Sequence, residues 1–102
     1  MTSLPDALTI DDLHRAYADG MTAAEVIEEV FQRIQTVDDP GIFIHLPEMA
    51  SVLAAAEALG PFDPVAKPLW GVPCAVKDNI DVAGMPTTAA CPAFEYMPDE
   101  DA

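Results

Sequence analysis

Lys77 is the side chain in this sequence that is best suited to carry chemistry. It is one of two lysines, and it ends the apolar run Gly71–Lys77 immediately before Asp78. Active sites of α/β proteins collect beyond the carboxyl ends of strands. A lysine enclosed there loses hydration, which favours the neutral amine that acts as a general base. The alternative, which spacing alone favours, is a surface lysine whose ammonium group pairs with Asp78 or Asp81.

The residues after Lys77 have the composition of a tight loop. Within residues 78–88, Asn79 and Asp81 can hydrogen-bond to nearby backbone groups, and Gly84 can take a positive φ angle. Loops held by a rigid scaffold often carry catalytic residues, so one interpretation is an active-site loop. The other interpretation is an ordinary surface loop.

The remaining candidates for chemistry are two cysteines and two histidines. Cys74 faces away from Lys77 on an alternating strand, and we expect a buried structural thiol there. Cys91 follows the paired threonines closely, but the sequence offers no base that would activate its thiol. Together with His14 and His45, the cysteines lack the spacing of a zinc site, so we expect no metal.

Composition excludes several classes of partner. The 102 residues carry 18 acidic and 4 basic side chains, a formal net charge of −14. Binding to nucleic acid or to an anionic membrane surface needs clustered Lys and Arg, so neither partner is expected. No apolar run approaches the roughly 20 residues of a spanning helix, and the first residues do not resemble a signal peptide. The two cysteines are expected to be free thiols, which favours the cytoplasm.

Three helices are predicted in the first part of the chain. The first is short, is capped by Thr9 and ends before Gly20. The second begins at the capping box Thr22–Glu25 and has one apolar stripe at helical spacing. The third covers residues 48–59 and ends at Gly60. The inward residues of the three helices are predicted to be Leu13, Ala16 and Tyr17; Val26, Ile27, Val30, Phe31 and Ile34; and Met49, Val52, Leu53, Ala56 and Leu59.

Two apolar segments are predicted to be strands. Ile42–Leu46 follows a turn signal at residues 39–41. Gly71–Lys77 follows a proline-rich loop at residues 61–68 and has small or apolar residues on both faces. Such a strand is typical of the buried, two-sided sheets of α/β proteins.

The segment that contains Lys77 resembles the lysine region of the amidase signature family. Pro68–Thr88 carries this resemblance, and residues 68–96 are its most specific part. The continuation Ala89–Tyr96 is most similar to the allophanate hydrolase branch of that family. General amidases and the A-type proteins of glutamyl-tRNA amidotransferases more often have a Gly-Ser type of sequence at this point. The preceding helices and short strand are also similar to the start of the amidase fold.

The resemblance implies a Ser–cis-Ser–Lys triad in which Lys77 is the catalytic base. In the family, one serine attacks the amide carbonyl and a bridging serine relays its proton to the lysine. Backbone amides of a Gly/Ser-rich loop stabilise the oxyanion. Both family serines follow the lysine, whereas the serines here, Ser3 and Ser51, precede Lys77. Lys77 is thus the one triad member implied in this sequence, which reverses the preference for a surface lysine, and no metal or organic cofactor is implied.

One interpretation of the whole sequence follows from this resemblance. Residues 1–102 are expected to be an N-terminal fragment of an amidase domain, with a helical section at 1–60 and the lysine-bearing strand and loops at 61–102. The implied fold is α/β, the incomplete N-terminal portion of a mixed sheet flanked by helices. The complete enzyme is expected to hydrolyse allophanate, a small amide, in urea degradation. This chain alone is expected to be inactive and marginally stable.

Three alternatives stay open. The first is that the complete enzyme is a general amidase or an A-type component of a glutamyl-tRNA amidotransferase. The second is that the chain is a non-catalytic interaction module derived from the amidase fold. The third is that the chain is a separately encoded half of a split amidase. The expected partners are the small amide substrate, the remainder of the amidase domain, or a second copy of this chain.

Overall fold

The chain forms two compact units, seen here in a computed structural model that describes residues 4–102. One unit, which we call the helical unit, runs to Val37 and continues from Glu48 to Pro73. The other, the loop unit, comprises Asp38–Pro47 and Cys74–Ala102. Ser3 lies outside the described residues. Because each unit has its own internal contacts, the two are described separately.

Helix α1, Ile10–Ala18, forms as its capping signals predict. The Thr9 hydroxyl oxygen accepts a hydrogen bond from the Asp12 backbone amide at 3.1 Å, which satisfies one of the free amides of the first turn. Gly20 follows the helix with a φ angle of +106°. The three side chains predicted to point inward are all buried: Leu13, Ala16 and Tyr17.

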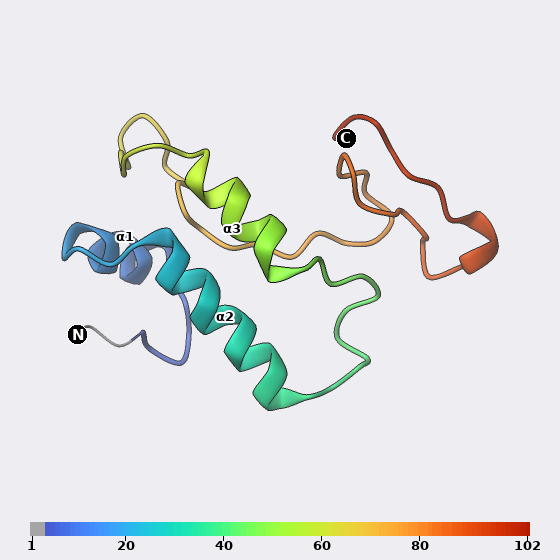
Figure 1. Ribbon diagram of the computed structural model, residues 1–102, viewed down its shortest axis with the longest axis horizontal. Coiled ribbons are helices and arrows are strands. Elements are labelled where there is room, and N and C mark those ends of the chain that lie inside the picture. Colours follow the sequence, from blue (N-terminus) through green and yellow to red (C-terminus); the bar gives the residue numbers. More distant parts are fainter. Residues whose placement is uncertain (1–3) are drawn as a thin grey trace. The chain divides into compact units, whose positions relative to one another are not determined.

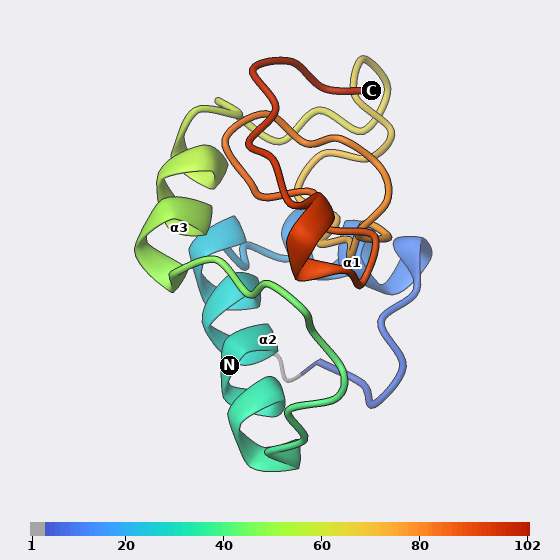
Figure 2. The same ribbon diagram turned by 90° about the vertical axis from the view of Figure 1, so that its right-hand side faces the viewer.

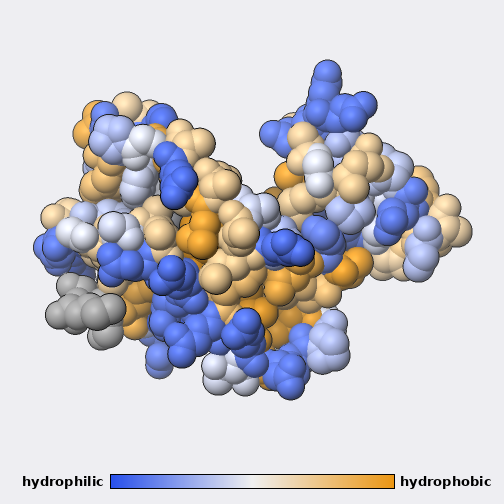
Figure 3. Space-filling view, in the orientation of Figure 1, coloured by the Kyte–Doolittle hydropathy of each residue, from blue (hydrophilic) through white to orange (hydrophobic). Residues whose placement is uncertain are grey.

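Helix α2, Ala23–Val37, begins with the predicted capping box. The Glu25 amide donates to the Thr22 hydroxyl oxygen at 3.2 Å, and the Thr22 amide donates to the Glu25 carboxylate at 3.3 Å. Val26 and Ile27 are buried, and hydrophilic side chains cover much of the visible face of α2 in Figure 3. No helix among residues 4–102 combines the length and the apolarity needed to cross a membrane.

Helix α3, Met49–Glu57, packs beside α2, as Figures 1 and 2 both show. It is rich in alanine, whose small side chains permit close approach to a neighbouring surface. Every residue of α3 is half-buried or exposed. The prediction that Met49 points inward is wrong, because its side chain is 40% exposed.

An aromatic cluster forms the centre of the helical unit. Tyr17 of α1 and Trp70 meet edge to face, with ring centroids 4.9 Å apart, and Phe62 packs against Trp70 at 5.3 Å. These geometries are the favoured ones for aromatic pairs. Buried Leu13 and Val26 surround the rings. The cluster therefore joins α1 and α2 to the proline-rich segment that contains Trp70.

Gly71 is held directly against Tyr17. The Tyr17 hydroxyl donates a hydrogen bond to the Gly71 carbonyl oxygen, and burial raises the pKa of Tyr17 to about 12. Gly71 has a φ angle of +68°, and a Cβ atom there would lie 2.8 Å from the Tyr17 ring. Glycine meets both requirements because it has no Cβ.

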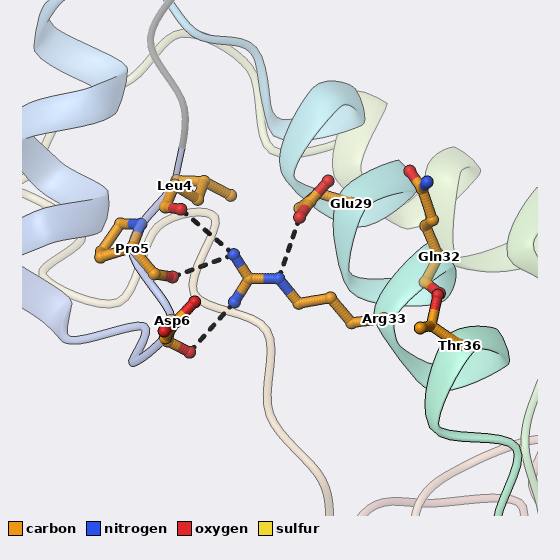
Figure 4. Close-up of polar contacts among 7 residues, drawn as sticks. All are labelled: Leu4, Pro5, Asp6, Glu29, Gln32, Arg33 and Thr36. Carbon is orange, nitrogen blue, oxygen red and sulfur yellow. Dashed lines mark hydrogen bonds and ion pairs between the residues drawn. The ribbon is translucent and has the colours of Figure 1, made fainter.

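Arg33 fastens the N-terminal segment to α2. Its guanidinium group donates to the carbonyl oxygens of Leu4, Pro5 and Asp6 at 3.3, 2.9 and 3.1 Å (Figure 4). Its Nε donates to the carboxylate of Glu29, which lies one helical turn earlier, at 2.9 Å. The planar, forked guanidinium can reach all four oxygens at once, which a lysine ammonium cannot.

The predicted α/β fold with a mixed sheet flanked by helices is wrong for residues 4–102. The structure there is helical with long loops, and its one β-type contact is an isolated antiparallel bridge between Thr87 and Tyr96. Ile42–Leu46 is irregular. Gly71–Lys77 starts in a turn and continues without regular structure, and the backbone amides from Cys74 to Lys77 donate to no backbone carbonyl in the described part.

The two predicted strands lack partners, which explains why they do not form a sheet. A β-strand is defined by hydrogen bonds to a neighbouring strand, and an apolar run cannot supply that neighbour itself. Residues 74–77 are exposed, so the prediction that this segment is buried between layers is also wrong. Ile44 in the other segment is 61% exposed.

Gly71→Ala is expected to destabilise the helical unit by at least about 2 kcal/mol, because it adds a clash with Tyr17 to the cost of a positive φ angle. Gly60→Ala is the matched control, since Gly60 has a φ angle of +74° with no atom within 4 Å of a built Cβ. It should cost only about 1 kcal/mol. Urea unfolding followed by Trp70 fluorescence measures both, and equal losses would contradict the role of the Tyr17 contact.

Arg33→Lys is expected to release the N-terminal segment. The ammonium group cannot satisfy three carbonyl oxygens and a carboxylate, and the lost charged hydrogen bonds are worth about 1 kcal/mol in total at this partly exposed site. Chymotryptic cleavage after Leu8 should therefore become about fivefold faster. Arg15→Lys, which changes only an exposed pair with Asp12, is the control and should leave the rate unchanged. An unchanged cleavage rate in Arg33→Lys would show that the guanidinium contacts are not needed to hold the N-terminal segment.

Candidate active-site loop

Lys77 lies in the loop unit, at the end of the exposed, irregular segment Cys74–Lys77. Its carbonyl oxygen accepts a hydrogen bond from the Ile80 amide at 2.9 Å, which closes a turn directly after it. Within residues 4–102 the Lys77 side chain is exposed rather than enclosed, and it forms no ion pair with Asp78 or Asp81. The alternative pairing considered for a surface lysine is therefore not formed here.

Asp78 is bound to the segment Thr88–Ala90. The Thr88 hydroxyl donates to the Asp78 carboxylate, and the Ala90 amide donates to the same oxygen at 3.3 Å. The Asp78 carbonyl oxygen accepts from the amides of Thr88 and Ala89 at 3.3 and 3.2 Å. The Thr88 hydrogen bond, followed by the backbone ones, lowers the pKa of the Asp78 carboxyl below its ordinary value.

Asp81 is bound in a similar way by the neighbouring threonine. The Thr87 hydroxyl donates to the Asp81 carboxylate at 2.9 Å, and the Tyr96 hydroxyl donates to the same oxygen. The hydrogen bond to Asp81 raises the pKa of Tyr96, because it stabilises the protonated phenol. Thr87 and Tyr96 also exchange backbone hydrogen bonds of 2.9 and 3.1 Å across their β-bridge.

The loop after Lys77 is thus extensively hydrogen-bonded. Of the residues predicted to order it, Asp81 and Gly84 contribute and Asn79 does not. The side chain of Asn79 forms no hydrogen bond among the described residues. Asp81 contributes through side-chain partners instead of nearby amides. Gly84 has the predicted positive φ angle, +79°, and its amide donates to the Pro98 carbonyl oxygen at 3.1 Å. Asp101 adds an anchor by accepting from the Ala83 amide at 2.8 Å.

The paired threonines and Tyr96 are the parts of this loop that the sequence does not reveal. Thr87 and Thr88 are only 2% and 6% exposed. Adjacent side chains in extended backbone point in opposite directions, so each threonine reaches a different carboxylate. The sequence feature that could have indicated these contacts is the pair Thr87 and Thr88, which follows Asp78 and Asp81 in the same loop.

Both cysteines are exposed and unpaired. The prediction that Cys74 is a buried structural thiol is wrong, because the strand expected to bury it does not form. The Cys91 amide donates to the Thr88 carbonyl oxygen at 2.8 Å, directly before the short 3-10 helix η1, Pro92–Phe94. Among the described residues, no group of three or more His, Cys, Asp or Glu side chains is arranged to hold a metal ion.

Thr88→Val, made in a Lys77→Ala chain so that no lysine neighbours Asp78, is expected to raise the midpoint of the Asp78 titration toward the ordinary value of 3.8. The hydroxyl stabilises the ionised carboxylate, so its contribution to stability is present above pH 3.8 and is lost as the pH falls through the lower folded-state pKa. NMR titration of the Asp78 carboxyl carbon measures the midpoint directly. Thr87→Val, which removes a hydroxyl from Asp81 instead, should leave it in place. A midpoint that does not respond to Thr88→Val would refute the hydrogen bond.

Comparison with known proteins identifies relatives of the chain. A model of the amidase family matches residues 25–102. The urea amidolyases of Saccharomyces cerevisiae and Lachancea kluyveri are 74% and 76% identical over 34 residues, which are 33% of this chain and 2% of each relative. The A-type component of the glutamyl-tRNA(Gln) amidotransferase of Exiguobacterium sibiricum is 37% identical over 100 residues, 91% of this chain and 20% of that relative.

These matches concern a limited part of each relative, since the chain spans from 2% to 20% of their length. The family model nevertheless covers well over half of this chain, including Lys77 and the loop that follows it. The chain therefore belongs to the amidase family.

Proposed function

We propose that this chain supplies Lys77 as the general base of an amidase that hydrolyses allophanate. The observation that carries the proposal is the identity of 74% and 76% to two urea amidolyases over a third of the chain. In this chain the Lys77 side chain is exposed and unpaired, and we propose that the remainder of the amidase domain encloses it.

The proposed reaction uses the neutral amine of Lys77. A bridging serine passes the proton of the nucleophilic serine to this amine as the nucleophile attacks the amide carbonyl. The ammonium group formed on Lys77 then returns the proton to the departing nitrogen, and water releases the acyl group from the serine. Neither serine is among the residues that follow Lys77 in this sequence. We propose that they belong to the remainder of the amidase domain.

The same proposal covers the organisation of the chain. Residues 1–102 are proposed as an N-terminal part of an amidase domain, with the helical section at 1–60 and the lysine-bearing segment at 61–102. The remainder of that domain is the proposed partner, and the cytoplasm is the proposed compartment because both thiols are free.

A second candidate is the A-type component of a glutamyl-tRNA(Gln) amidotransferase. It is favoured by the length of the match to the Exiguobacterium sibiricum protein, which covers 91% of this chain. The much higher identity to the urea amidolyases places this candidate second.

Lys77→Ala is expected to lower allophanate hydrolysis by about 10²- to 10⁴-fold, the usual contribution of a general base. The test enzyme is the Saccharomyces cerevisiae urea amidolyase in which this chain replaces the homologous segment, with ammonia release from allophanate as the readout. Lys67→Ala is the control, because Lys67 is the other lysine and donates to the Leu59 carbonyl oxygen. The 102-residue chain alone should release no ammonia.

Three results would count against the proposal. Full activity of the Lys77→Ala chimaera would remove Lys77 from the mechanism. Failure of the unmodified chimaera to release ammonia from allophanate would count against allophanate as the substrate and favour the amidotransferase component. Hydrolysis by the isolated chain that is abolished by Lys77→Ala would contradict the need for the remainder of the domain.

A further inference from the structure

We propose that Thr88 is a positioning residue for Lys77, because it holds the Asp78 carboxylate where that carboxylate does not form an ion pair with the lysine amine. The inference rests on the proposed function of Lys77 as a base. It assigns a role to a buried hydroxyl that touches neither the amine nor an amide substrate.

Asp78 is the acidic residue next to Lys77 in the sequence, but one oxygen of its carboxylate and its carbonyl oxygen are held by another segment. Its carboxylate accepts from the Thr88 hydroxyl and the Ala90 amide, and its carbonyl oxygen accepts from the amides of Thr88 and Ala89. All of these partners belong to the three-residue segment Thr88–Ala90. Thr88 is only 6% exposed, so its hydroxyl has little access to water as an alternative partner.

The backbone of that segment is shaped around Asp78. Ala89 and Ala90 have φ angles of +50° and +59°, a conformation that costs an alanine about 1 kcal/mol or more. Two such residues in succession bring the amides of Ala89 and Ala90 onto the carbonyl and carboxylate of Asp78. The hydrogen bonds to Asp78 offset the strain and fix the direction of the carboxylate.

The second carboxylate close to Lys77 in the sequence is engaged independently. Asp81 accepts from the hydroxyls of Thr87 and Tyr96. Each of the two carboxylates that could pair with Lys77 is therefore bound by one of the paired threonines. The lysine forms no ion pair among the described residues, although it belongs to a chain with 18 acidic side chains.

An ion pair between Asp78 and Lys77 would make the amine less reactive. A carboxylate beside an ammonium group stabilises the charged form, and a charged amine can neither accept a proton nor act as a nucleophile. Removal of the Thr88 hydroxyl frees one acceptor site on Asp78, after which the carboxylate can turn toward Lys77. The change affects Asp78 and leaves Asp81 with both of its hydroxyl donors.

The test is the rate at which Lys77 is acylated by acetic anhydride in the 102-residue chain, measured by mass spectrometry relative to Lys67. The chain has only these two lysines, so Lys67 is an internal reference for reagent and pH. Thr88→Val should slow acylation of Lys77 about two- to fivefold, as expected for a new exposed ion pair. Thr88→Ser keeps the hydroxyl and should retain the original rate.

The double variant Asp78→Asn/Thr88→Val separates positioning from a structural effect. It lacks the carboxylate that would pair with Lys77, so the rate should return to that of the unmodified chain. If Thr88→Val only loosens the loop, Lys77 stays as accessible as before and its rate does not fall, which would overturn the proposal. A fall that persists in the double variant would also overturn it. Neither result depends on amide hydrolysis. The proposed function is tested separately, by ammonia release from allophanate.

Discussion

The loop unit depends on two hydrogen bonds, each from a buried threonine hydroxyl to an aspartate carboxylate. Thr87 and Thr88 are among the few buried side chains in this unit, and a buried hydroxyl without a partner would cost free energy. The carboxylates of Asp81 and Asp78 accept from them. Charge-assisted hydrogen bonds of this kind are stronger than neutral ones. They order a segment that has neither a sheet nor an apolar core to hold it.

The helical unit is stabilised in a different way. Its order comes from aromatic and aliphatic packing around Trp70, with the close contact between Tyr17 and Gly71 at one edge. The Trp70 Nε1 is buried and finds no hydrogen-bond partner among the described residues, so the indole contributes through its apolar surface. Polar contacts lie at the periphery, where Arg33 binds the N-terminal segment.

The features that the sequence predicts correctly are those determined by neighbouring residues. The Thr9 cap and the Thr22–Glu25 capping box involve atoms three residues apart, and the apolar stripe of α2 follows helical spacing. The strands are predicted wrongly, because an apolar run does not specify a pairing partner. Lys77 is singled out by its motif, and its role stays a prediction. The hydroxyl contacts escape prediction, because they join residues six to fifteen positions apart through a loop whose path is not evident beforehand.

The exposed segment that leads to Lys77 has a consequence for self-association. Extended backbone with free amides is a template on which another chain can add a strand, the first step of aggregation. Pro73 and Lys77 flank the apolar residues of this segment. Proline cannot donate to a growing ladder, and stacked lysine charges repel one another. The side chain proposed to activate a nucleophile is therefore also one that discourages copies of this chain from stacking into fibrils.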